Sequence, residues 1–257
     1  MCTLALYLRQ FENYPLIVAA NRDEHFSRPT ASPEMWRGDP PILAGKDLAA
    51  GGTWLGVNSA RIAAAVVNRR IKTEDIDAPR SRGLLCLDML QAATMADARA
   101  ALPYEDAGRY QPFLLVVASA EGAFAAYNAT GDIATVELRS GLHVFSNTSF
   151  TDEKAQKLDR ARDLFAAAAE PLASLLKNDM SLDSAVDVLK TVLSDHTPIE
   201  NGDGKSALCV HAPDADYGTV SSSIIFLSSR DRRFHFYHSL GRPCRTEFHP
   251  LPPLAIV

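Results

Sequence analysis

A cysteine at position 2 is the residue of this 257-residue chain best suited to covalent chemistry. Its side chain is small, so we expect Met1 to be removed, which leaves an α-amine and a thiol on one residue. The amine has an ordinary pKa of about 7.7–8.0 and the thiol one of about 8.5. Because the amine can act as the base for its own thiol, Cys2 is a candidate N-terminal nucleophile for acyl transfer.

A polar cluster is expected beside this cysteine. The apolar runs Thr3–Leu8 and Pro15–Ala20 are separated by a short polar stretch, which is typical of a β-hairpin. Both runs are apolar on consecutive residues, so both faces of these strands should be covered. Counting back along the hairpin places Cys2 opposite Arg22.

The cluster Asn21–Glu24 would then lie next to the first residues of the chain. The Arg22 cation favours a thiolate, and the Asp23 carboxylate can hold the amine in place. A structural interpretation is also open, in which Cys2 packs into the sheet and the charged residues bond to the loops at the strand ends.

The remaining elements predict one α+β domain over residues 1–257. A long ordered loop is expected over 25–47 and one helical stretch over 82–102. Two further helices should begin near Thr151 and Ser181. Further strands are expected at 52–57, 62–67, 113–118, 123–127, 133–138, 142–146, 207–211, 220–228 and 233–238.

The composition of the chain argues against several classes of protein. Lys and Arg number 26 and Asp and Glu 31, a net charge of −5, which argues against a dedicated nucleic-acid binder or a basic membrane-surface protein. No apolar run approaches the roughly 18–20 residues of a membrane span. The first residues lack the positive flank and cleavage site of a signal peptide, so we expect a cytoplasmic protein.

The cysteines at 2, 86, 209 and 244 form no C-x-x-C pair, and the histidines show no zinc spacing. We therefore expect reduced thiols, no metal site and no cofactor. Cys86 and Cys209 stand among apolar residues and are expected in the core. The glycine-rich segment 51–56 matches neither a phosphate loop nor a dinucleotide fingerprint.

Several motifs together resemble those of the NRDE family, also called the transport and Golgi organization protein 2 family. They occur in order over nearly the whole chain: Met1-Cys2-Thr3, Asn21-Arg22-Asp23-Glu24 followed by Arg28-Pro29, Gly51-Gly52-Thr53-Trp54-Leu55-Gly56, Asn68, Ser146-Asn147 and Tyr217-Gly218-Thr219. That family is similar to the N-terminal nucleophile hydrolases. The resemblance implies their α+β fold, a four-layer αββα sandwich.

Cysteine-type members such as choloylglycine hydrolases and penicillin V acylases suggest catalytic roles. By this resemblance Cys2 is the nucleophile, Arg22 lies against the thiolate and Asp23 orients the amine. Here Asp23 follows Arg22 directly, whereas choloylglycine hydrolases place two residues between the two. Asn68 and Asn147 end apolar strands, as the oxyanion and amine-contacting asparagines of that superfamily do; an asparagine there can also be a turn residue.

We assign substrate-binding roles to Asn21, Trp54 and Arg69. Arg69 belongs to a basic group that could steer an anionic substrate or form a solvated loop: Arg69, Arg70, Lys72, Arg80 and Arg82. One position departs from the family pattern. Val220 follows Tyr217-Gly218-Thr219 where the family usually has arginine, so the contact made by that arginine is lost or replaced.

These observations leave two main classes of function, both with a small molecule as the partner. The sequence does not indicate the oligomeric state. The first is a hydrolase of a linear amide or related acyl compound, with an acyl-enzyme on Cys2. The second is a non-catalytic binding or trafficking protein for a haem or lipid-type molecule, as the family resemblance implies. Hydrolysis requires the thiol, whereas binding should survive Cys2→Ser. A scaffold protein, the third option, predicts no stabilisation by a ligand.

Overall fold

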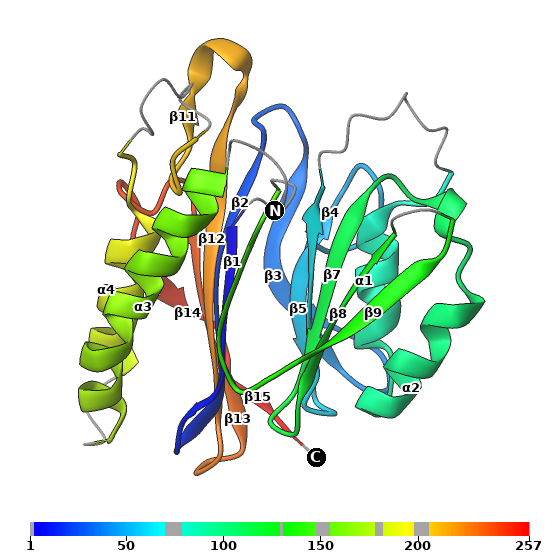
Figure 1. Ribbon diagram of the computed structural model, residues 1–257, viewed down its shortest axis with the longest axis horizontal. Helices are drawn as coiled ribbons and strands as arrows, with labels where there is room; N and C mark the ends of the chain where they lie inside the picture. The colour runs from blue at the N-terminus through cyan, green and yellow to red at the C-terminus, as the bar shows by residue number, and fades with distance from the viewer. Residues whose placement is uncertain are drawn as a thin grey trace. The chain divides into compact units, whose positions relative to one another are not determined.

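The computed structural model describes residues 3–69, 79–128, 131–147, 155–177, 182–197 and 206–256. The chain forms two compact units, one of Met1–Arg28 with Ser140–Pro253 and the other of Pro29–Arg139 with Leu254–Val257. Each unit contains an antiparallel sheet with α-helices on one face (Figure 1).

The first unit contains a sheet with the strand order β10-β1-β2-β12-β13-β14, and β11 pairs with β12. Its elements are β1 (Thr3–Phe11), β2 (Tyr14–His25), β10 (Gly141–Ser146), α3 (Ala155–Lys177), α4 (Leu182–Leu193), β11 (His211–Ala212), a 3₁₀ turn (Pro213–Ala215), β12 (Tyr217–Ser228), β13 (Arg233–Leu240) and β14 (His249–Pro250). The predicted helix starts at Thr151 and Ser181 lie outside the described residues.

The long strands of this sheet are buried on both faces. Every residue from Thr3 to Leu8 of β1 is buried, and so is every residue from Leu16 to Asp23 of β2. This confirms the interpretation of the two consecutive apolar runs. Segment 207–211, in contrast, forms a strand only from His211 onward.

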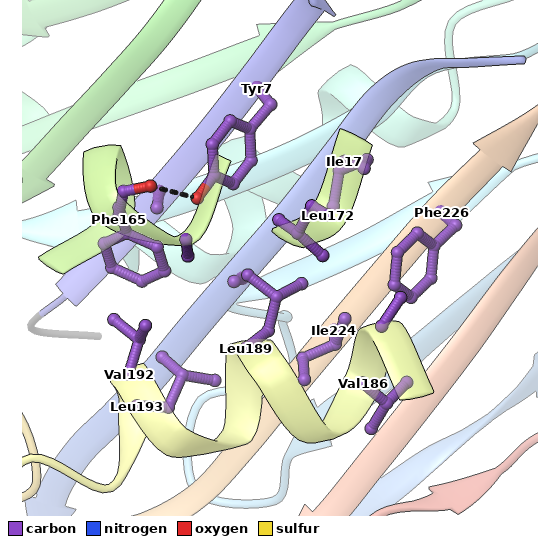
Figure 2. Close-up of a cluster of buried hydrophobic side chains, with 14 of the residues drawn as sticks. Tyr7, Ile17, Phe165, Leu172, Val186, Leu189, Val192, Leu193, Ile224 and Phe226 are labelled. Atoms are coloured by element: carbon purple, nitrogen blue, oxygen red, sulfur yellow. Dashed lines mark hydrogen bonds between the residues drawn. The ribbon is translucent and has the colours of Figure 1, made fainter. Parts of the chain in front are cut away.

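Helices α3 and α4 cover one face of the first sheet, where their apolar stripes meet alternate residues of the strands (Figure 2). The predicted α3 stripe, containing Phe165, is buried. Burying a side chain of this size contributes about 1.5–3 kcal/mol. The hydroxyl of Tyr7 donates a 2.6 Å hydrogen bond to the Phe165 carbonyl oxygen, which satisfies a polar atom inside this apolar layer.

The second unit contains a sheet with the strand order β3-β4-β5-β6-β7-β8-β9. Its elements are β3 (Thr30–Trp36), β4 (Ile42–Asp47), β5 (Leu55–Asn58), β6 (Ala63–Asn68), α1 (Arg82–Leu90), α2 (Met95–Ala101), 3₁₀ turns (Leu102–Tyr104 and Ala107–Arg109), β7 (Phe113–Ala118), β8 (Ala123–Asn128), β9 (Ile133–Leu138) and β15 (Leu254–Ala255). Its core lies between the sheet and α1 and α2 and includes Cys86, as expected.

Two predictions for this unit were wrong. Segment 25–47 is not a loop, because it contains the β3–β4 hairpin. The strand β3 lies at the sheet edge, where polar residues and Pro33 are tolerated and weaken the strand pattern. The helical stretch over 82–102 is two helices, because the Thr94 side chain accepts a hydrogen bond from the Asp97 amide and begins α2 there.

The α+β class is confirmed, with two antiparallel sheets and four α-helices in the described residues. Each unit supplies one sheet layer and one helical layer. No described helix combines the length and the apolar character needed to cross a membrane.

Candidate active site

The start of the chain is held inside the first sheet. Thr3 pairs with Asn21 of β2 on one side and with Ser146 of β10 on the other. This is the register predicted from the hairpin pattern. Cys2 lies outside the described residues. Its chain neighbour Thr3 nevertheless identifies the sheet end at which the candidate site has to be examined, and we call it the chain-start end.

Asn21 connects this sheet end to the helical layer. Its amide nitrogen donates to the carbonyl oxygens of Leu193 (2.8 Å) and Leu208 (2.9 Å), and its oxygen accepts from the Ser222 hydroxyl (2.6 Å). The Leu193 carbonyl ends α4, where the helix has no partner of its own for that group. Asn21 is fully buried, and both of its N–H groups are used within the protein.

Arg22 brings a buried positive charge to the chain-start end. Successive side chains alternate along a strand, so Arg22 lies on the face opposite to that of Asn21 and the helices. The residue is 4% exposed, and its Nη2 lies 3.8 Å from Oε2 of Glu24. A guanidinium stays charged at every pH at which the protein is folded. This position therefore offers a permanent cation.

Asp23 is the centre of a buried network on the helix side of the sheet. The Thr219 hydroxyl donates a 2.6 Å hydrogen bond to its Oδ1. The same hydroxyl accepts a 2.8 Å hydrogen bond from the Val210 amide. The ammonium nitrogen of Lys157, on α3, lies 3.7 Å from Asp23 Oδ2, and both side chains are buried. Asp23 is thus held from β12 and from α3.

The sequence did not identify Lys157 as part of this network. Lysine is among the residues least often buried unless it is paired, and nothing in the flanking residues Gln156 and Leu158 distinguishes this one. Its partner is distant in sequence, so only the packing of α3 on the sheet reveals it.

A second polar pair was also missed. Ser223 of β12 and His238 of β13 are register partners, and their Oγ and Nδ1 atoms lie 3.0 Å apart. Both are buried, and burial lowers the pKa of His238 to about 4, so its imidazole is neutral at pH 7. Ser223 stands two residues beyond Ser221, which pairs with Arg22, so the pair shares the face on which Arg22 lies.

Val220, where the resemblance leads us to expect an arginine, lies at an irregularity of β12. The pairing of β12 with β2 shifts register between Thr219 and Ser221, so Val220 has no partner across the strand pair. Its carbonyl oxygen accepts a hydrogen bond from the Gly241 amide, 2.9 Å away. The side chain at this position is apolar and half-buried.

Asn147 follows Ser146 and so leaves the sheet beside the strand that begins with Thr3. The residue is half-buried. Within the ranges that the structure describes, its carboxamide makes no hydrogen bond.

The other predicted residues belong to the second unit. Asn68 ends β6 opposite Phe113, is half-buried and has no side-chain hydrogen bond to any described residue. Trp54 is 8% exposed, and its ring packs so closely over Gly45 that a Cβ there would lie 2.6 Å from it. The Arg69 guanidinium lies 5.4 Å from the centroid of the Tyr127 ring.

The basic group around Arg69 is only partly free to meet an anion. Arg80 pairs with Asp88 at 2.7 Å, and Arg82 donates to the Pro112 carbonyl oxygen at 3.0 Å. Arg70 and Lys72 lie outside the described residues. The two described members that follow Arg69 therefore fix local structure.

The chain matches one protein family over most of its length. The family described as Transport and Golgi organisation 2 matches residues 1–240. The human Transport and Golgi organization protein 2 homolog is 30% identical over 235 residues, which cover 84% of this chain and 83% of the human protein. The mouse homolog is 28% identical over 234 residues, with the same coverage of each chain.

Solved structures with little sequence similarity have the same fold. An N-acylethanolamine-hydrolyzing acid amidase ortholog from Caenorhabditis elegans matches with a TM-score of 0.55 at 14% identity, covering 87% of this chain and 92% of that one. A variant of the conjugated bile acid hydrolase from Clostridium perfringens matches with a TM-score of 0.54 at 8% identity, covering 100% and 98%. The chain therefore belongs to the Transport and Golgi organisation 2 family and has the N-terminal nucleophile hydrolase-like fold that its motifs predicted.

Proposed function

We propose that this protein hydrolyses a linear amide or a related acyl compound, with the Cys2 thiol as nucleophile after removal of Met1. One observation carries the proposal. Thr3, the chain neighbour of Cys2, pairs with Asn21 of β2. The next two residues of β2 are Arg22 and Asp23, so two buried charged side chains lie at the chain-start end. Burying a charged side chain costs free energy, so buried charges are usually paired or belong to functional sites. The two charges present here are a cation that favours the Cys2 thiolate and a carboxylate that can orient its α-amine.

The reaction has two half-steps. The sulfur attacks the carbonyl carbon, and the tetrahedral intermediate breaks its C–N bond while the α-ammonium gives its proton to the leaving amine. Water then attacks the thioester, the α-amine takes a proton from it, and the acid leaves as the thiol is restored. Arg22 favours the thiolate, and Asp23 orients the α-amine through its charge.

The developing oxyanion needs N–H donors, and Asn147 and Asn68 are proposed for this role. Asn68 ends β6 and Asn147 directly follows β10, and neither carboxamide has a hydrogen-bond partner among the described residues. One such donor contributes about 2.7–4 kcal/mol to the transition state. Each asparagine is tested separately by its alanine variant.

The geometry favours a different role for Asn21 from the substrate contact expected from the sequence. Both of its N–H groups are bonded to backbone carbonyls, so it positions β2. Trp54 is proposed as an apolar wall for the acyl group and Arg69 as a contact for an anionic one.

Two amides serve as first probes, an N-acylethanolamine and a conjugated bile acid, because the names of the similar solved structures refer to these compounds. Release of the acid is measured with the full-length protein freed of Met1, with Cys2→Ala, and with Cys86→Ala as the matched cysteine control. The proposal predicts turnover in the wild type and in Cys86→Ala only. Equal turnover in Cys2→Ala contradicts it.

The second candidate is a small-molecule binding or trafficking protein. It is favoured by the names of the family relatives, which refer to transport and Golgi organization. Haem and a long-chain acyl lipid are the probes for this function. Stabilisation by either probe that is equal in the wild type and in Cys2→Ser, together with no amide hydrolysis, supports binding over catalysis.

A further inference from the structure

Four side chains with metal-binding atoms lie near one another in the first unit, beside the hydrogen-bond network of Asp23 but without any residue of the proposed reaction among them. Cys209 precedes β11, His211 begins it, Cys244 lies in the turn after β13, and His196 follows α4. The two sulfur atoms are 3.7 Å apart, and the His211 Nε2 lies 3.4 Å from the Cys209 sulfur and 3.3 Å from the Cys244 sulfur. We call these four residues the Cys/His cluster.

These spacings are those of the edges of a zinc tetrahedron. With Zn–S bonds of about 2.3 Å and Zn–N bonds of about 2.0–2.1 Å, tetrahedral angles separate two sulfurs by about 3.8 Å and a sulfur from a nitrogen by about 3.5–3.6 Å. The three separations in the structure lie within about 0.3 Å of these values. The three atoms are thus already arranged around a common centre.

His196 is the candidate for the fourth ligand. Its ligand atom lies within 4.8 Å of those of His211 and Cys244, a group that does not include Cys209, and its side chain is exposed. Its Nδ1 lies 3.1 Å from the Ser194 carbonyl oxygen. Metal-bound histidines commonly donate their second ring N–H to such a carbonyl, which leaves Nε2 for the metal.

We propose that Cys209, His211, Cys244 and His196 bind one Zn²⁺ ion in a structural Cys₂His₂ site. Two thiolates neutralise the charge of the ion, and a zinc ion deprotonates the thiols that coordinate it. A closed set of four protein ligands is typical of a zinc ion that holds chain segments together.

A disulfide between Cys209 and Cys244 is the competing explanation. Its sulfurs would lie about 2.05 Å apart, and it would give no reason for two histidines to surround them. Here both cysteines are free thiols, and one imidazole nitrogen touches both sulfurs. The arrangement therefore favours a metal ion.

The metal would connect three segments that are distant in sequence. The Cys209 amide also donates a 2.8 Å hydrogen bond to the Asp195 carbonyl oxygen, next to His196. The amide of the following residue, Val210, donates a hydrogen bond to the Thr219 hydroxyl, and this hydroxyl donates to Asp23. Removing the metal should therefore loosen the support of Asp23 without removing any residue of the proposed reaction.

The test begins with the wild-type full-length protein, reduced and freed of metal. Addition of Co²⁺ should give the intense visible bands of a tetrahedral ion and a thiolate charge-transfer band, and one equivalent of Zn²⁺ should remove both. Zn²⁺ should also protect Cys244 from a thiol alkylator and raise the melting temperature. A folded, reduced protein that gives no such bands overturns the proposal, as does a Cys209–Cys244 disulfide in protein purified without an oxidant.

Variants assign the ligands. Cys209→Ser, His211→Ala and Cys244→Ser should each weaken Zn²⁺ binding by at least the roughly 10–100-fold that follows loss of an outer-shell partner. Cys86→Ala and His235→Ala are the matched controls and should bind Zn²⁺ as the wild type does. Cys2→Ala should also keep the metal, so a failure of the proposed hydrolase leaves this result unchanged. Full binding by His211→Ala would refute the assignment.

Discussion

Lys157 of α3 and Asp23 of β2 form an ion pair inside the first unit, with 3.7 Å between the ammonium nitrogen and the carboxylate oxygen Oδ2. The side chains are 3% and 0% exposed. Few pairs of this kind are tolerated in protein interiors, because two charges must be taken out of water. This pair fixes the only carboxylate among the residues that we propose for the reaction.

Removing one partner should strongly destabilise the protein. Lys157→Met leaves the Asp23 carboxylate buried without its cation, and we expect a loss of about 3–5 kcal/mol in the free energy of unfolding, measured in urea. Lys190→Met is the control, because its bridge to Glu247 lies at the surface. That variant should lose less than about 1 kcal/mol. Equal losses in the two variants would show that the buried ion pair contributes no more to the free energy of unfolding than the surface pair.

The stability of the protein should fall in mild acid because of His238. Burial lowers the pKa of His238 in the folded protein to about 4, from 6.5 in the unfolded chain. The unfolded chain therefore binds the proton first, so this contribution is complete above pH 6.5 and declines as the pH falls toward 4. The loss amounts to about 3 kcal/mol.

The control for this pH effect is His235→Gln, which removes a histidine that pairs with Asp231 near the surface. Unfolding free energies are compared at pH 7 and at pH 4.5 for the wild type, His238→Gln and His235→Gln. His238→Gln should show a clearly shallower decline than the other two. The same decline in all three proteins would rule out His238 as its source.

The asparagines at the chain-start end should separate into two classes. Asn21→Ala removes two donated hydrogen bonds inside the protein and should cost at least about 2 kcal/mol of stability. Asn147→Ala should leave stability within about 0.5 kcal/mol, because it is half-buried and its carboxamide has no partner in the described residues. If Asn147 donates to the oxyanion, its variant should lose about 10²–10³-fold in kcat. A large loss of stability in Asn147→Ala would contradict this division.

The charge on Arg22 should control the reactivity of Cys2. A cation within reach of a thiol lowers its pKa by about 1–3 units, so Arg22→Leu should slow alkylation of Cys2 at neutral pH by about tenfold or more. Arg28→Leu is the matched control, since Arg28 is more exposed and also approaches Glu24. Rates are measured by mass spectrometry of the N-terminal peptide. An unchanged alkylation rate in Arg22→Leu would show that Arg22 does not influence the Cys2 thiol.

Much of the chain-start end could be predicted from local patterns. The two apolar runs fixed the hairpin register, because shifting an antiparallel strand by one residue turns every side chain to the other face. Once Thr3 was known to lie opposite Asn21, the position of Arg22 and Asp23 followed from the alternation of the strand. The family motifs then supplied the fold, which periodicity alone could not.

The contacts between distant segments could not be predicted. Lys157 meets Asp23, and His238 meets Ser223, only because α3 and β13 pack where they do. The Cys/His cluster was missed for the same reason, since His196 and Cys244 stand far apart in the sequence and follow no zinc spacing. The hairpin of β3 and β4 was missed because an edge strand needs no continuous apolar run.

The central claim is that Cys2 becomes a free N-terminal nucleophile, and one measurement tests it most directly. The intact mass of the purified protein is determined before and after a limiting dose of a thiol alkylator. The account predicts a mass short by one methionine and a single fast adduct that maps to Cys2. Retention of Met1, or a Cys2 that reacts no faster than the thiol of Cys244, would contradict it.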